Sequence, residues 1–248
     1  HFDTFMNSYK TVLRSASLKS QTLVLGPEYA LASRQQFPEY LHGLGLRGTG
    51  IEIGVYEGEF AASFISRWQG QSYHGVDPHD VYENVLHSLP LKSEPRWHFH
   101  QKRDYQILDE FEDQSLDYVY IDSVHTYKWV STTIEKWIKK IRPGGMISGH
   151  DFCCADHANY ENEKKGASAY PLVAKHIKHI PSCGIYKCLN GYCDNKDKPR
   201  LGNLKIGFSG VVQAVLEAAE RHERSVAFTL EGVNPGWGTG NPSWWFIV

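Results

Sequence analysis

The apolar residues of this chain follow two kinds of pattern. Short continuous apolar runs have the length of buried strands, whereas apolar residues that recur every three to four positions predict amphipathic helices. The two patterns alternate in the first two thirds of the chain. The predicted strands are Gly50–Val55, Tyr73–Val76, Trp97–His100, Tyr118–Ile121 and Met146–Ile147, and the predicted helices are Phe60–Trp68, Asp104–Phe111 and a segment with Val130, Ile134, Trp137, Ile138 and Ile141 on one face.

Residues 117–152 form a predicted strand–helix–strand unit, in which Arg142-Pro143-Gly144-Gly145 is expected to stop the helix. A right-handed crossover makes the two strands parallel. Parallel strands place their carboxyl ends at the edge where open α/β sheets bind ligands. We therefore expect an active site built from the polar residues that follow the two strands. These residues are Asp122, His125, His150 and Asp151.

The two ends of the chain extend this pattern. The first 48 residues predict helices over Thr4–Ser15 and Gly26–Leu46, with breaks at prolines and glycines. A helix over Val211–His222 and two strands, Ser225–Leu230 and Trp244–Val248, close the chain. The alternation predicts an α/β fold with a Rossmann-like, doubly wound sheet and a terminal hairpin.

Residues 153–207 interrupt the alternation, apart from a short helical stretch near Leu172–Ile180. The segment is polar and turn-rich, and a long insertion of this kind is more often functional than idle. Its cysteine spacing is compatible with one or two disulfides, with thiols, or with a metal site that includes nearby histidines. All five cysteines of the chain lie here: Cys153, Cys154, Cys183, Cys188 and Cys193.

Composition and charge narrow the classes of protein to which this chain can belong. With 248 residues, 41% hydrophobic and 22% charged, the chain fits one globular domain. We divide it into a helical cap (1–48), a cofactor-binding core (49–152), an insertion or substrate lobe (153–207) and a C-terminal helix with a β-hairpin (208–248). A net charge of −2 gives no basis for nucleic-acid binding, and no apolar run has transmembrane length. Because the chain begins at His1, the sequence leaves both a cytoplasmic and a secretory location open.

A second polar cluster follows the first strand, in Glu52-Ile-Gly54-Val-Tyr-Glu-Gly58. Glycines at a strand-to-helix turn allow backbone amides to approach a ligand, and a helix N-terminus favours a negative group. The spacing differs from the G-x-G-x-x-G of dinucleotide-binding folds. Asp77 ends the second strand, where a carboxylate can accept hydrogen bonds from both hydroxyls of a ribose. Together these positions predict a ligand that contains a nucleoside.

At the level of motifs, the chain resembles class I S-adenosylmethionine-dependent methyltransferases over about residues 48–152 and 208–248. The motifs are the glycine turn, His74-Gly-Val-Asp77, Tyr120-Ile-Asp122-Ser-Val-His125-Thr-Tyr127, Arg142–Asp151 and the terminal Ser243-Trp-Trp-Phe-Ile-Val. The nearest subgroup carries D-x-x-H-x-Y and G-H-D motifs and is related to cation-dependent O-methyltransferases. The resemblance implies a seven-stranded sheet whose last strand is antiparallel. It also implies cofactor contacts from Glu52, Gly54, Gly58, Asp77, Arg103, Asp104 and Asp122.

Methyl transfer to a hydroxyl is an in-line displacement that needs a positioned, deprotonated oxygen. The catalytic candidates are His125 as general base, Asp122 and His150. The resemblance also implies Mg²⁺ held by Asp122 and Asp151, because Mg²⁺ prefers oxygen ligands. Phe152 stands where that subgroup usually has a third ligand.

Structural roles compete with these interpretations. Asp122 can cap the following helix, either histidine can be a hydrogen-bonded structural residue, and Asp151 can bond loop amides. Tyr127 and Trp237 are candidates for contact with the acceptor. The favoured function is an O-methyltransferase that acts on a small molecule or a sugar, with homodimerisation left open and no nucleic-acid or membrane partner. The alternative is a methyltransferase fold that binds ligands without turnover.

Overall fold

The computed structural model describes residues 23–25, 29–79, 90–153, 171–181, 209–231 and 241–248. These residues fall into two compact units. One unit comprises Gln35–His125, Trp129–His150 and Ile247–Val248, and the other comprises the described parts of His1–Arg34, Thr126–Lys128 and Asp151–Phe246. The predicted fourfold division of a single domain is not tested by this clustering and stays a prediction.

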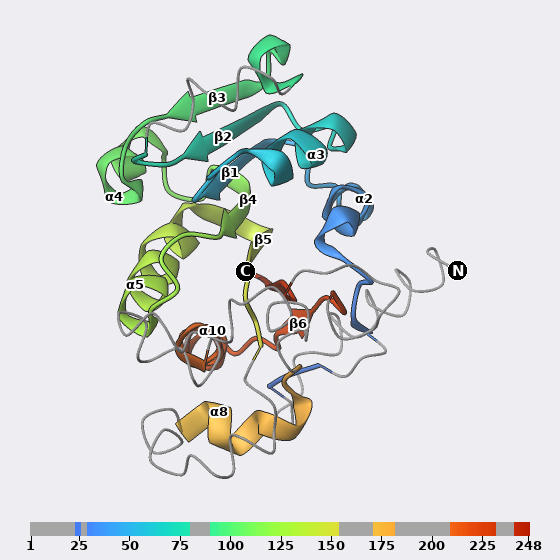
Figure 1. Cartoon of the computed structure of the whole chain (residues 1–248), viewed down its shortest axis with the longest axis vertical. Helices are drawn as coiled ribbons and strands as arrows, with labels where there is room; N and C mark the ends of the chain where they lie inside the picture. The colour runs from blue at the N-terminus through green and yellow to red at the C-terminus, as the bar shows by residue number, and fades with distance from the viewer. Residues whose placement is uncertain (1–22, 26–28, 80–89, 154–170, 182–208, 232–240) are drawn as a thin grey trace, which may run out of the picture. The chain divides into compact units, whose positions relative to one another are not determined.

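The strands form one seven-stranded sheet in the order β3-β2-β1-β4-β5-β7-β6 (Figure 1). Strands β1 to β5 pair in parallel, whereas β6 and β7 pair antiparallel. The predicted doubly wound sheet with an antiparallel last strand is therefore confirmed. The strands are β1 Thr49–Ile53, β2 Ser72–Val76, β3 Trp97–His100, β4 Leu116–Ile121, β5 Ile141–Gly149, β6 Ala227–Phe228 and β7 Trp244–Ile247.

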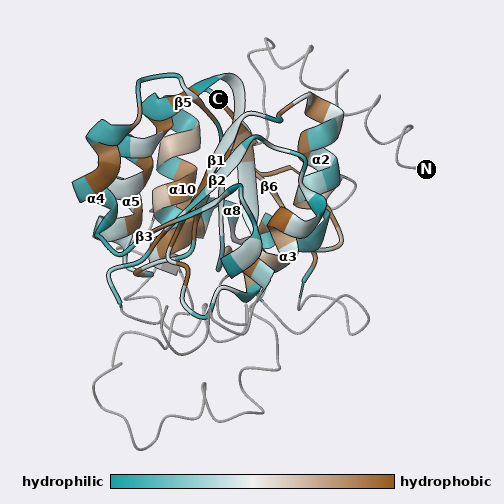
Figure 2. Cartoon of the chain, turned by 90° about the horizontal axis from the view of Figure 1, so that it is seen from above, coloured by the Kyte–Doolittle hydropathy of each residue, from teal (hydrophilic) through white to brown (hydrophobic). Residues whose placement is uncertain are grey.

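Helices cover both faces of the five parallel strands. Figure 2 shows α2 (Phe37–Leu44) and α3 (Glu59–Arg67) on one side, and α4 (Asp104–Ile107) and α5 (Tyr127–Trp137) on the other. The predicted inward faces of α3 and α5 are buried, which confirms the helical periodicity. Short 3-10 helices are η2 Arg34–Gln36, η4 Pro90–Ser93, η5 Leu108–Glu110 and η6 Ile138–Lys140.

Aromatic rings fill the space between α3 and the sheet. The Phe64 ring stacks on Tyr73 of β2 and Tyr118 of β4, with centroid distances of 4.7 and 5.0 Å. One turn earlier, Phe60 stacks on Tyr120 at 4.3 Å. Such pairs contribute about 0.5–1.5 kcal/mol beyond the burial of their area. The layer therefore fixes α3, and with it the turn between β1 and α3.

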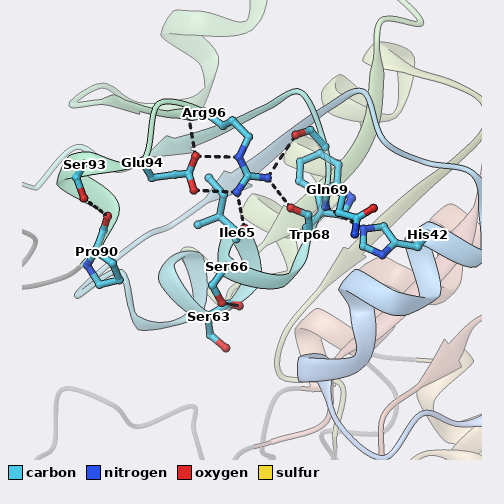
Figure 3. A network of polar contacts seen from close by, with 11 residues as sticks. His42, Ser63, Ile65, Ser66, Trp68, Gln69, Pro90, Ser93, Glu94 and Arg96 are labelled. Carbon is cyan, nitrogen blue, oxygen red and sulfur yellow. Dashed lines mark hydrogen bonds and ion pairs between the residues drawn. The ribbon is translucent and has the colours of Figure 1, made fainter.

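Arg96 joins the start of β3 to the end of α3 (Figure 3). Its guanidinium donates to the carbonyl oxygens of Ile65 and Trp68, at 2.8 and 2.5 Å. Glu94 holds the guanidinium from the other side through two hydrogen bonds of 2.8 Å. A cation at a helix C-terminus satisfies carbonyl groups that the helix leaves unpaired. Helix α3 thus ends at a side chain supplied by the edge of the sheet.

The second unit contains α10 (Ser209–Arg221) and α8 (Pro171–His176), which η7 (Ile177–His179) extends. The side-chain oxygen of Gln213 accepts hydrogen bonds from the backbone N–H groups of Leu172 and Val173. One side chain of α10 therefore satisfies two of the amide groups that the start of α8 leaves unpaired.

Two segments differ from their predicted structure. In the described part of 26–46, a continuous helical stretch runs from Arg34 to Leu44, whereas Leu31 forms a bridge to Thr229 within the second unit. The helix predicted to end at residues 142–145 ends earlier, and Ile141 already begins β5. Gly144 and Gly145 belong to that strand and exchange hydrogen bonds with Val248. Sheet pairing has therefore outweighed the local turn preference of the Pro-Gly-Gly sequence.

Several predictions fall outside the described residues: the helix Thr4–Ser15, the contact from Trp237, and Cys154, Cys183, Cys188 and Cys193. Cys153 is buried and is disulfide-bonded. Among the helices that the structure describes, none has both the length and the apolar character needed to cross a bilayer.

Three histidines lie together at the β2–β3 edge of the sheet. His74 Nδ1 lies 3.0 Å from His100 Nε2, and the His74 and His98 ring centroids are 4.8 Å apart. Burial, followed by the nearby His98 and His100, lowers the pKa of His74 from 6.5 to about 4. Burial also lowers the pKa of His100. The His74 and His100 rings are therefore neutral near pH 7.

We expect this cluster to make the fold sensitive to acid. The folded pKa of His74 lies below its unfolded value, so the unfolded chain binds the proton more tightly, and stability falls as the pH drops from about 6.5 to 4. The full shift corresponds to about 3 kcal/mol, and partial solvent exposure reduces the expected loss to about 1–2 kcal/mol. Urea unfolding of His74→Gln at pH 7 and pH 4.5 measures this loss, with the exposed His222→Gln as control. Equal acid destabilisation of both variants and the unmodified chain would contradict it.

Candidate functional site

The turn after β1 requires glycine at position 54. Gly54 has a φ of +90°, and a Cβ there would lie 2.2 Å from the backbone oxygen of Asp122. The Gly54 N–H donates to Val76 O of β2, and the Asp122 N–H donates to Ile53 O of β1. The absent side chain therefore allows the ends of β1, β2 and β4 to converge, as the sequence predicted for a ligand-binding edge.

Asp77 is buried and holds the same turn through its carboxylate. Its Oδ2 accepts hydrogen bonds from the backbone N–H groups of Val55 and Tyr56, both at 3.0 Å. Its Oδ1 accepts from the N–H of His79 at 2.9 Å. A carboxylate has about four acceptor positions, so the contacts from the described residues leave one for a ligand hydroxyl while the turn keeps this conformation. The sequence placed Asp77 at this edge but gave no indication of the three amides.

Tyr56 has an unusual conformation within this turn. Its φ is +47°, in the left-handed region that residues other than glycine seldom adopt. Its side chain is 71% exposed, the highest value among the large hydrophobic residues described. The hydrogen bond from the Tyr56 N–H to Asp77 holds the backbone in this conformation. The ring lies on the surface beside the end of β1.

The other cofactor candidates lie on neighbouring elements of the same unit. Gly58, with a φ of +75°, is the N-cap residue of α3. Glu52 is buried within β1, and its Oε2 accepts a hydrogen bond of 3.1 Å from the hydroxyl of Tyr73. Burial, followed by the charge of Glu52, raises the pKa of Tyr73 well above its usual range. Glu52 therefore has a structural contact within the core beside its expected contact with a ligand.

Arg103 and Asp104 follow β3 at the start of α4. Arg103 is the N-cap residue, and its N–H donates to Gln106 Oε1 at 2.8 Å. Asp104 is buried, and its Oδ2 lies 3.4 Å from the Thr133 hydroxyl on α5. Its buried Oδ1 has no hydrogen-bond partner in the part of the chain that is described. A buried carboxylate oxygen is costly without a donor, and an N–H of a bound ligand would satisfy it.

The chemical centre predicted after β4 and β5 is assembled around Asp122. His125 Nε2 lies 3.3 Å from Asp122 Oδ1, and His150 Nδ1 lies 3.7 Å from the same oxygen. The His125 side chain is 39% exposed, whereas that of His150 is 11% exposed. Of the two rings, His125 is the one that a substrate can reach. Asp122, His125 and His150 thus meet, although His150 lies 28 positions (150 minus 122) beyond Asp122 in the chain.

Asp151 follows His150 directly but belongs to the second unit. It has a φ of +61°, and its Oδ1 accepts a hydrogen bond from the side-chain amide of Asn241. The next residue, Phe152, is buried and stacks against Phe228 at 6.3 Å. The Phe152 side chain therefore packs in the hydrophobic core. Asn241 lies 90 positions from Asp151, and no local pattern in the sequence pointed to it.

Tyr127, a predicted substrate residue, is tied to α10. Its hydroxyl donates to Glu217 Oε2 at 2.7 Å, and Glu217 Oε1 accepts from the Gln213 amide, also at 2.7 Å. Gln213 is the residue that caps α8. Tyr127 thus has a role in holding α10, and its proposed contact with the acceptor stays a prediction.

Part of the chain is similar to a known protein family. Residues 51–152 match the family model described as a methyltransferase domain. An uncharacterised protein, y4gI of Sinorhizobium fredii, is 29% identical over 94 residues, which are 38% of this chain and 10% of that protein. The chain thus spans about a tenth of this curated relative.

Solved structures with similar folds include two O-methyltransferases. One is TomG from Streptomyces achromogenes, involved in tomaymycin synthesis and solved with SAM (14% identity, TM-score 0.49, covering 98% of this chain and 89% of that one). The other is from Bacillus cereus, solved with SAH (12% identity, TM-score 0.49, covering 99% and 91%).

Proposed function

We propose that this chain, whose residues 51–152 match a methyltransferase domain model, transfers a methyl group from S-adenosylmethionine to a hydroxyl of a small molecule or sugar. The observation that carries this proposal is the pairing of Asp122 with His125 at the end of β4. A carboxylate beside an imidazole orients the ring and stabilises the imidazolium that forms when it accepts a proton. This arrangement suits a hydroxyl acceptor, which must lose its proton.

The cofactor would lie along the ends of β1, β2 and β3. Its ribose would bond the remaining acceptor position of Asp77, and its adenine would approach Arg103 and Asp104. The orphaned Oδ1 of Asp104 fits an exocyclic amine, which is a hydrogen-bond donor. Gly54 and Gly58 allow the methionine part to approach the backbone. When bound, S-adenosylmethionine supplies the electrophilic methyl group, and these residues hold it in position.

We propose a divalent cation only as an assistant to His125. Asp122, His125 and Asp151 have the side-chain chemistry for such an ion. Two observations limit the fit: Asp151 accepts the Asn241 amide, and the buried Phe152 offers no oxygen. Mg²⁺ binding would need the Asn241 contact to rearrange, whereas the His125–Asp122 pair is already formed. Proton transfer to His125 is therefore the central step of the proposal.

An acceptor screen with isotopically labelled S-adenosylmethionine tests this function. Catechols, flavonoids, sugars and macrolides are incubated with the protein, in Mg²⁺ and in EDTA. We expect label transfer to an oxygen of at least one acceptor in both conditions, because the base does not need the metal. Transfer abolished by EDTA and restored by Mg²⁺ would make the cation essential. Binding of S-adenosylmethionine without transfer to any acceptor would favour the alternative, a ligand-binding protein that keeps the fold.

Cofactor affinity should depend on Asp77. Replacing Asp77 with Asn removes the charge that strengthens hydrogen bonds to the ribose, and we expect the dissociation constant to rise by about 10–100-fold, corresponding to about 1.5–3 kcal/mol. Calorimetric titration with S-adenosylhomocysteine measures the change. Asp109→Asn, at an exposed position after α4, is the matched control. Equal affinities for the two variants would remove Asp77 from the proposed site.

A further inference from the structure

The histidine cluster at the β2–β3 edge has no part in the proposed methyl transfer. His98 and His100 are two positions apart on β3, so their side chains lie on one face of the sheet. His74 is the register partner of His98 on the neighbouring parallel strand β2. Three imidazoles from two adjacent strands therefore share one face. Because β3 is the last strand on that side of the sheet, the cluster lies at an edge.

Two of the nitrogens are already close to the spacing of metal ligands. His74 Nδ1 and His100 Nε2 are 3.0 Å apart. Nitrogens bound to one tetrahedral Zn²⁺ at about 2.0–2.1 Å lie roughly 3.3–3.4 Å from each other. A small opening of this pair would therefore admit an ion between them. The His98 ring is 4.8 Å from His74 by centroid and is exposed, and its side chain would have to turn to bring a nitrogen to the pair.

The surroundings of His100 orient its ring for this purpose. While Nε2 faces His74, Nδ1 faces Glu110 Oε2 at 3.8 Å. A carboxylate on the far nitrogen of a ligating histidine is the usual outer partner in metal sites, because it fixes the tautomer and raises ligand basicity. The other Glu110 oxygen, Oε1, forms an ion pair with Lys102 Nζ at 2.8 Å. On the remaining side of His74 stands the Phe111 ring, edge-on at 5.0 Å.

We propose that His74, His98 and His100 form a binding site for Zn²⁺ or a similar first-row transition-metal ion. Water would occupy the fourth coordination position of the ion, or a Glu110 oxygen would do so if that side chain turns inward. Imidazole nitrogen favours Zn²⁺, Ni²⁺ and Cu²⁺ over Mg²⁺, which takes oxygen ligands. The site is thus chemically distinct from the cation proposed beside Asp122.

The position of the cluster connects it to the proposed cofactor site. The ion would link β3 to β2 just before Asp77, whose backbone N–H donates to His100 O. Bound metal would therefore stabilise the edge strand that leads into Arg103 and Asp104.

Binding is tested on the full chain, first with Zn²⁺ in competition with a chromophoric chelator, and then with Co²⁺. Thiols are alkylated beforehand, so that cysteines do not compete for the ions. We expect one ion per chain at this site and the visible absorption typical of tetrahedral Co²⁺ with nitrogen ligands. His98→Gln and His100→Gln should each lower the Zn²⁺ affinity by about 100-fold, and Glu110→Gln by about 10-fold, as an outer partner does.

Two controls separate this site from others in the chain. His222→Gln removes an exposed histidine just after α10 and should leave the affinity unchanged. Asp122→Asn removes the main carboxylate of the methyl-transfer centre and should also leave Zn²⁺ binding at the cluster unchanged, so the two proposals succeed or fail separately. Circular dichroism of each variant verifies folding.

The histidine ring signals in NMR spectra give a second measurement that does not depend on the variants. On addition of Co²⁺, the signals of three rings should shift strongly and together, and they should be the signals that disappear in His74→Gln, His98→Gln and His100→Gln. Zn²⁺ affinity that is equal in the unmodified chain and in His98→Gln and His100→Gln would overturn the proposal. The three rings would then form a hydrogen-bonded cluster only.

Discussion

His125→Ala should lower the rate of methyl transfer by about 10²–10⁴-fold, which is the usual contribution of a positioned general base. The imidazole lies 3.3 Å from Asp122 and is the more exposed of the two histidines at that carboxylate. Because the proposed cofactor contacts lie on other residues, affinity for S-adenosylhomocysteine should change little. Single-turnover transfer and calorimetric titration measure the two quantities separately.

The pH profile distinguishes a base from a structural histidine. The unmodified protein should lose activity in acid, because a protonated imidazole cannot accept the proton of the acceptor hydroxyl. In His125→Ala, transfer should rise with pH, because hydroxide and ionised acceptor replace the lost base. His222→Ala is the control for loss of a histidine elsewhere. Activity of His125→Ala within a few-fold of the unmodified protein at neutral pH would rule out the proposed role.

Gly54→Ala is expected to destabilise the fold by about 2–4 kcal/mol. The new Cβ would lie 2.2 Å from Asp122 O and 2.8 Å from Ser123 Cα, so backbone must move at the end of β4. The positive φ adds a conformational cost of about 1 kcal/mol to the overpacking. Urea unfolding measures the stability, and the same displacement should shift Asp122 and abolish transfer in the protein that remains folded.

Gly45→Ala is the matched control for Gly54→Ala. Gly45 also has a positive φ, +77°, but nothing lies within 4 Å of a Cβ built on it. Its substitution should cost only the conformational term of about 1 kcal/mol. The difference between the two variants therefore isolates the collision with β4. If both lose the same stability, the approach of β1 to Asp122 is looser than the structure indicates.

Sequence periodicity predicted the fold well, because each parallel strand and its helix bury a continuous or repeating apolar face. The errors lie where distant pairing decided the outcome. Leu31 pairs with Thr229, and Gly144 and Gly145 pair with Val248, against their local helix or turn preferences. Local sequence carries no information about such partners, so these segments could be assigned only from the structure.

The candidate site was predicted to the same extent. Asp122, His125 and His150 meet because strand order alone brings the ends of β4 and β5 together. The amides on Asp77 and the partner of Asp151 could not be predicted, because they depend on loop geometry and on a residue 90 positions away. The positions of the chemical groups followed from topology, whereas their hydrogen-bond partners did not.

The hydrogen bonds between Asp77 and the turn after β1 affect the timing of catalysis in the proposed reaction. In the proposed site, a ribose that bonds both oxygens of the Asp77 carboxylate would have to displace one of the two amides on Oδ2, those of Val55 and Tyr56, so cofactor entry would include a rearrangement of this turn. The same amide would return to Asp77 when the spent cofactor departs and would replace the hydrogen bond that is lost. The turn would thereby favour release of the spent cofactor, and release steps limit many enzymes.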